Sequence, residues 1–218
     1  IAKALSVAII SSSVALMGCE KAEKTSISTA VEMPQKQTSL LRTKSESLEA
    51  VYAEMRAKQV SNVSYKLSVT IDNKSESFSG STELMFDLAK DNHNDLTIDF
   101  DEGTVKSLKV NGKVVNFNYE KWFITIPASE LSAGKQSITI DYERPYSTDG
   151  SGFHRFVDPK NGEVYLYTDF EPYDANRLFP HFDQPDLKAS YEIKVTAPSH
   201  WQIISATRET NISENGDN

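Results

Sequence analysis

The first regular hydrophobic pattern in the chain after residue 40 has the period of a helix. Large apolar side chains recur there with the spacing i, i+3, i+4 and i+7, at Leu48, Val51, Tyr52 and Met55. This spacing predicts a short amphipathic helix over residues 45–59, with one face against the domain that follows. Thr43 and Glu46 have the spacing of a capping box at the start of such a helix.

Beyond residue 60 the hydrophobic period falls to two. Apolar and polar side chains alternate over residues 63–71, 78–88 and 96–100, which is the pattern of strands with one buried face. Asn111 and Gly112 lie between two short apolar runs and form a strong hairpin signal, because both residues tolerate positive φ. We expect further strands at residues 122–126, 138–142, 164–169, 190–197 and 201–205.

The arrangement of these strands predicts the fold class. Many short alternating strands without a helical crossover favour antiparallel sheets over a parallel α/β arrangement. We therefore predict an all-β domain over residues 60–218, built as an antiparallel β-sandwich or saddle-like sheet. The hydrophobic content of 39% is adequate for a packed core. Because no Met begins the sequence and a polar run ends it, we expect it to be truncated at both ends.

The amino-terminal residues have the pattern of a lipoprotein signal. Residues 4–18 are apolar, follow Lys3 and are shorter than the roughly 20 residues that span a bilayer. They lead into Leu16-Met17-Gly18-Cys19, which resembles the bacterial lipobox. We therefore expect a signal peptide over residues 1–19, lipidation of Cys19 and a flexible linker over residues 20–44, whose polar start cannot bury enough surface to order. An ordinary secretory signal, or a buried helix with an incidental Cys, is the alternative.

The net charge and the cysteine content limit the binding partners and the kinds of site that this chain can have. The formal charge of -8, without a run of Lys and Arg, argues against nucleic acid. The single cysteine excludes an internal disulfide and a Cys-rich metal site. Acyl chains on Cys19 would anchor the protein to a membrane. Glu20 after this Cys resembles lipoproteins sent to the outer membrane, so we expect a lipid-anchored protein of the bacterial cell envelope that faces the periplasm.

One segment, residues 167–185, is unusually dense in aromatic, charged and Pro residues. It reads Tyr-Thr-Asp-Phe-Glu-Pro-Tyr-Asp-Ala-Asn-Arg-Leu-Phe-Pro-His-Phe-Asp-Gln-Pro. This segment resembles a signature of the aminopeptidase N family of zinc metallopeptidases, in which Thr-Gln-aromatic-Glu leads into Asp-Ala-x-Arg-x-x-Phe-Pro-x-Phe-Asp-x-Pro. The resemblance implies the amino-terminal, cleft-forming domain of a zinc aminopeptidase, which removes residues from the free N-terminus of a peptide substrate.

The same resemblance implies a substrate-binding role for Glu171. In the family, a Glu or Gln at the matching position helps to hold the ammonium group of the substrate, and a carboxylate suits this because charge-assisted hydrogen bonds are short and directional. Asp169 stands where the family commonly has Gln, on the same face of an extended strand. Asp169 either strengthens amine binding or raises the local negative potential. Without the motif, Glu171 reads as a strand-end side chain facing water.

The remainder of the signature is expected to be structural. We expect Arg177 to pair with Asp174 or Asp183 and so to fix the loop. Phe179 and Phe182 should pin the loop to the core. A metal role for His181 is not expected, because no second ligand lies at suitable spacing.

The zinc site of that family is not encoded in these residues. Such a site needs His-Glu-x-x-His, in which two imidazoles one helical turn apart bind the ion. None of the four histidines is four residues from another, and Gly-x-Met-Glu-Asn is missing too. We therefore expect zinc to be bound by a downstream catalytic domain, with no catalytic or metal-binding residue in this fragment and no hydrolysis by the fragment alone. The competing hypotheses are a non-enzymatic surface lipoprotein whose β-sandwich binds peptide or polysaccharide, and a family member that has lost zinc.

Overall fold

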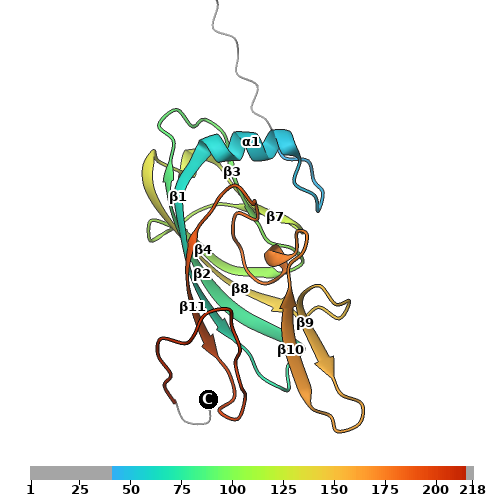
Figure 1. The fold of residues 1–218 in the computed structure, drawn as a ribbon. Coiled ribbons are helices and arrows are strands. Elements are labelled where there is room, and N and C mark those ends of the chain that lie inside the picture. The colour runs from blue at the N-terminus through green and yellow to red at the C-terminus, as the bar shows by residue number, and fades with distance from the viewer. Residues whose placement is uncertain (1–40, 215–218) are drawn as a thin grey trace, which may run out of the picture. The chain divides into compact units, whose positions relative to one another are not determined.

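The computed structural model describes residues 41–214, and within them one α-helix precedes a series of strands (Figure 1). The helix is α1 (Ala50–Gln59). The strands are β1 (Val60–Thr70), β2 (Ser77–Leu88), β3 (Leu96–Asp99), β4 (Thr104–Val110), β5 (Lys113–Val114), β6 (Asn118–Glu120), β7 (Phe123–Ile126), β8 (Gly134–Pro145), β9 (Gly152–Val157), β10 (Val164–Asp169) and β11 (Ser190–Thr196). Two short 3-10 helices, η1 (Ala128–Glu130) and η2 (Ala175–Arg177), complete the elements. The prediction of an all-β domain is confirmed.

Three sheets make up the domain. The largest has six strands in the order β11-β1-β2-β8-β4-β5, the second has the order β3-β7-β6, and β9 and β10 form a separate hairpin. All pairs are antiparallel except β1 with β11, which run parallel. The predicted hairpin at Asn111 and Gly112 joins β4 to β5, with φ of 49° and 80° at the two turn residues.

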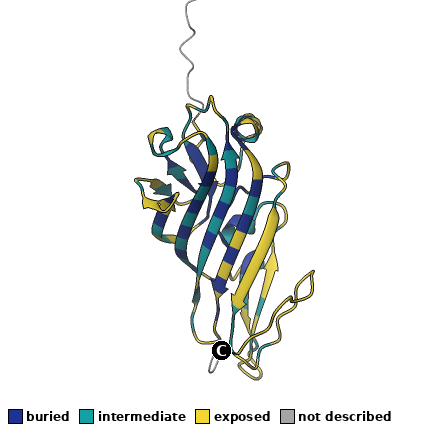
Figure 2. Ribbon diagram, turned by 90° about the vertical axis from the view of Figure 1, so that its left-hand side faces the viewer, coloured by how far each residue is buried: buried dark blue, intermediate teal, exposed yellow. Residues whose placement is uncertain are grey.

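The hydrophobic core joins the six-stranded and three-stranded sheets. Alternate residues of β1 and β8, among them Tyr65 and Ile140, are buried together with Ile98 of β3 and Ile124 of β7 in one cluster. Figure 2 shows this alternation as bands along the strands. All four residues of β3 are buried, including Asp99 at its end. The edge strand β11 is largely exposed.

The helix differs from its prediction in length and in orientation. It begins at Ala50, five residues later than expected, and its N-cap residue Glu49 makes no side-chain capping bond. The buried face contains Tyr52, Arg56 and Gln59, whereas Val51 is 64% exposed. Tyr52 of the apolar repeat is thus buried as predicted, and the polar partners of Arg56 and Gln59, not Val51, complete the buried face.

One strand prediction was wrong, because residues 201–205 form no strand. The strand β9 was not among the predicted strands. Gly152, at φ +69°, begins β9, and a Cβ there would lie 2.7 Å from the Cβ of Arg177. Close approach of the hairpin to η2 therefore requires glycine at this position. The predicted signal peptide, Cys19 and most of the linker lie outside the described residues. No helix of residues 41–214 is long and apolar enough to cross a membrane.

Candidate functional site

The signature segment begins within the last residues of β10. Glu171 is exposed in the turn after this strand, and its backbone N–H donates to Oδ1 of Asp169 over 3.3 Å. Asp169 thus supports the turn through one carboxylate oxygen. The carboxylate of Glu171 accepts no hydrogen bond and makes no ion pair with any side chain of residues 41–214. The two predicted substrate-binding residues therefore lie together, and Glu171 presents the unengaged charge.

Hydrogen bonds and buried aromatic side chains hold the loop that follows Glu171, which we call the signature loop (residues 172–185). Oδ2 of Asp183 accepts hydrogen bonds from the backbone N–H and from Nδ2 of Asn176, both 3.0 Å long. Phe179 and Phe182 are buried, as predicted, and the N–H of Phe182 donates to the Tyr65 hydroxyl. These hydrogen bonds and the two buried rings restrict the conformations that the loop can adopt.

Arg177 has a partner that the sequence did not suggest. Its guanidinium lies 2.8 Å from Asp149 and 3.4 Å from Asp174. The pairing with Asp174 was one of the two expected, and the pairing with Asp183 does not form, since Asp183 bonds to Asn176. Arg177 thereby links the signature loop to the turn that precedes the β9–β10 hairpin.

The strongest anchor of the loop is Asp99, the last residue of β3. Its fully buried carboxylate forms ion pairs with Arg42 and, at 2.8 Å, with Arg56. The same carboxylate accepts the backbone N–H of Asp183 over 2.8 Å. The Asp99 backbone also exchanges two hydrogen bonds with His181. Core strand, upstream helix and signature loop therefore meet at one side chain.

Besides its ion pair with Asp99, each arginine also contacts the signature loop. Arg42 donates to the Tyr173 hydroxyl over 3.0 Å, and Nε of Arg56 donates to Oε1 of Gln184 over 2.9 Å. Nε2 of Gln184 in turn donates to the carbonyl of Ala53 in α1 over 2.8 Å. Sequence reasoning missed both arginines. The available signal was the four-residue spacing of Tyr52 and Arg56, which places them on one helical face.

The environment of Asp99 keeps it ionised. Complete burial by itself would raise the pKa of this carboxyl, but attraction to Arg56 and Arg42, with smaller contributions from His181 and the Asp183 N–H, lowers it below the ordinary value. A buried carboxylate with these partners is a fixed negative charge at neutral pH.

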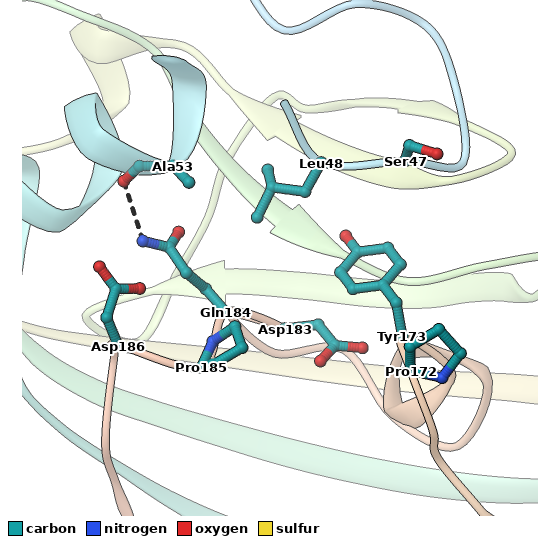
Figure 3. A pocket seen from close by; sticks show the side chains of 9 residues that line it. All are labelled: Ser47, Leu48, Ala53, Pro172, Tyr173, Asp183, Gln184, Pro185 and Asp186. Carbon is teal, nitrogen blue, oxygen red and sulfur yellow. Dashed lines mark hydrogen bonds between the residues drawn. The ribbon is translucent and has the colours of Figure 1, made fainter. Parts of the chain in front are cut away.

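A groove of about 480 Å³ lies beside this network. Ser47, Leu48 and Ala53 line one side of it, and the other side is formed by Pro172, Tyr173 and residues 183–186. Figure 3 shows the Tyr173 ring and the Asp183 carboxylate at this groove. Pro172, which follows Glu171 in the sequence, is one of the residues that line the groove.

Residues 41–214 do not provide a metal centre. They contain no group of three or more His, Cys, Asp or Glu side chains arranged to hold an ion. His181 is buried, stacks on Phe179 with ring centroids 4.2 Å apart, and lies 3.0 Å through Nδ1 from the Phe179 carbonyl. Its surroundings are those of a packing residue.

The fold of this chain is similar to that of solved zinc metallopeptidases. The M1 zinc metallopeptidase of Deinococcus radiodurans has a similar structure, with a TM-score of 0.59 and 15% identity over 73% of this chain and 37% of that one. Leukotriene A4 hydrolase of Saccharomyces cerevisiae gives a TM-score of 0.56 and 17% identity, over 65% of this chain and 24% of that one.

Sequence similarity makes the assignment specific. Residues 61–218 match the Peptidase M1 N-terminal domain, and the chain belongs to this family. It is 33% identical over 157 residues to aminopeptidase N of Streptomyces lividans, covering 70% of this chain and 18% of that protein. It is also 38% identical over 108 residues to a probable M1 family aminopeptidase of Encephalitozoon cuniculi, covering 48% and 12%. The chain thus spans less than a fifth of these relatives.

Replacing Asp99 by Ala should destabilise the domain strongly. The change leaves two buried guanidinium groups without their carboxylate, and breaking a buried ion pair in this way costs about 3–5 kcal/mol. The loss should appear as a lower free energy of unfolding in urea titrations. Lys44→Gln is the control, because it removes the exposed ion pair with Glu120 and should leave the free energy of unfolding nearly unchanged. Equal effects of the two substitutions would contradict the role given to Asp99.

Asp101, two residues beyond Asp99, should make stability fall between about pH 4 and pH 6. Burial and the neighbouring charge of Glu102 raise the pKa of Asp101 to about 6, against the opposing attraction of Arg144. The folded state then binds more protons than the unfolded state across this interval, so stability is lost as the pH rises. Asp101→Asn should flatten the dependence by on the order of 1 kcal/mol, allowing for screening by water. Urea unfolding at several pH values measures it, and an unchanged slope would contradict the assignment.

Proposed function

We propose that this chain is the amino-terminal part of a zinc aminopeptidase and that Glu171 helps to bind the free amino terminus of the peptide substrate. The observation that carries the proposal is the exposed carboxylate of Glu171 on a turn held by Asp169. Membership of the M1 family and similarity to aminopeptidases support the substrate class.

The chemistry of substrate selection explains why a carboxylate belongs here. An aminopeptidase cuts next to a free amino terminus, so it needs a negative group at a fixed position to receive an ammonium group. A hydrogen bond from an ammonium to a carboxylate is short and about twice as strong as a neutral one. A peptide with a blocked amino terminus leaves that carboxylate unpaired and is disfavoured. Asp169 supports this role by holding the turn and by adding negative potential.

Zinc in the complete enzyme is proposed to be held by residues of a downstream domain. The described side chains do not form a site for it. When bound, zinc would polarise the peptide carbonyl and activate a water molecule. The contribution of this domain would be to orient the substrate and to form one wall of the cleft.

Glu171→Ala in the full-length enzyme should raise the Michaelis constant for aminoacyl substrates. Loss of a hydrogen bond to a charged group costs about 1.5–3 kcal/mol, which corresponds to about 10- to 100-fold in kcat/KM. Steady-state kinetics on aminoacyl-p-nitroanilides measures the change, and the zinc content should stay unchanged. Glu163→Ala is the control, because Glu163 is an exposed carboxylate that directly precedes β10, the strand that leads to Glu171. Wild-type kinetics in Glu171→Ala would remove the proposed role.

We also propose that Cys19 carries a lipid anchor in the bacterial cell envelope, with the outer membrane as the expected location. The lipobox-like Leu16-Met17-Gly18-Cys19 after an apolar stretch supports the proposal. Cys19→Ala should abolish incorporation of labelled fatty acid and shift the protein from the membrane fraction to the soluble fraction, since stable anchoring depends on the acyl chains. Retention of the label in the variant would contradict it.

A further inference from the structure

We infer that the segment before the family-matched region contributes to the substrate site through Arg42 and Arg56, which are positioning residues for the turn that carries Glu171. The inference deepens the proposed function and rests on it. The family match begins only at residue 61, yet both arginines reach the signature segment.

Arg42 holds the start of the signature loop. Its side chain is 1% exposed and is enclosed by three contacts, namely the ion pair with Asp99, the hydrogen bond to Tyr173 and the Phe123 ring 4.2 Å away. Tyr173 lies two residues after Glu171, and its ring lines the groove (Figure 3). The guanidinium thus connects a buried core carboxylate to a side chain at the site.

Arg56 holds the far end of the same loop. Its guanidinium is fully buried, and it contacts Asp99 at 2.8 Å, Gln184 at 2.9 Å and the carbonyl of Thr97 at 3.4 Å. Gln184 returns a bond to the helix backbone at Ala53. The loop between Tyr173 and Gln184 is therefore held at both ends, and Asp99 is common to both attachments.

The position of Glu171 depends on these attachments because little regular structure follows it after β10 ends at Asp169. Between the end of β10 and Asp183 the only regular element is η2, which has three residues. A displacement of about 1 Å in a substrate-positioning group can cost on the order of 100-fold in rate. Fixing the loop to a core strand through planar guanidinium groups restricts such displacements, since each guanidinium donates in a fixed geometry.

The test compares variants of the full-length enzyme in pairs. Tyr173→Phe removes only the hydroxyl that accepts from Arg42, and Arg42→Met removes the guanidinium. Both should raise the Michaelis constant for aminoacyl substrates about tenfold, because a displaced Glu171 loses part of its charge-assisted hydrogen bond to the substrate. Inhibition by a zinc-binding hydroxamate that has no amino group should not change. Lys44→Gln, an exposed residue of the same segment, should behave as wild type.

A double-mutant cycle separates positioning from general stability. If Arg42 acts through Glu171, then Arg42→Met and Tyr173→Phe should add no further increase in a Glu171→Ala background. Multiplicative effects, or unchanged Michaelis constants in folded Tyr173→Phe enzyme, would overturn the inference while leaving the role of Glu171 intact. If Glu171→Ala itself has wild-type kinetics, the proposed function fails and the inference fails with it.

Discussion

The carboxylate of Asp99 is the interaction on which this structure depends. It is fully buried between two guanidinium groups and a backbone N–H, and none of these charges can be left unpaired in a dry interior without a large cost. The requirement fixes α1 against the domain, because Arg56 must face Asp99. It also fixes the signature loop, because the N–H of Asp183 completes the same shell. Helix, core strand and loop are therefore ordered together.

The substrate-binding role proposed for Glu171 sets two conditions on its surroundings. A carboxylate that receives a substrate ammonium must be free of internal partners and yet held in place. The Glu171 carboxylate has no partner among residues 41–214, and neighbouring groups hold the turn and the loop instead. These groups are the Asp169 side chain, the bonded pair Asn176 and Asp183, and the Tyr173 hydroxyl. The close packing of Gly152 on Arg177 adds support from the hairpin side. The loop is thus held by packing and hydrogen bonds, whereas Glu171 before it is exposed.

Local patterns in the sequence predicted most of the strands and the position of Glu171 at the end of one of them. Alternation cannot tell a parallel from an antiparallel partner, so the parallel pairing of β11 with β1 was not predictable. The rotation of α1 was mispredicted because the expected apolar face included Val51, whereas the helix buries Arg56, whose partner lies 43 residues away at Asp99. Non-local ion pairs of this kind leave no period in the sequence.

Two carboxylates at the end of β3 show how partners decide charge. Asp99 has two guanidinium groups in direct contact, and its pKa is lowered despite complete burial. Asp101 has Arg144 only at 4.0 Å, because Nε of that arginine donates to the Asp101 backbone carbonyl instead. Burial then prevails, and the pKa of Asp101 rises to about 6. Mild acid therefore changes the charge beneath η2 while the Asp99 anchor stays ionised, so the attachment of the signature loop to the core persists where Asp101 titrates.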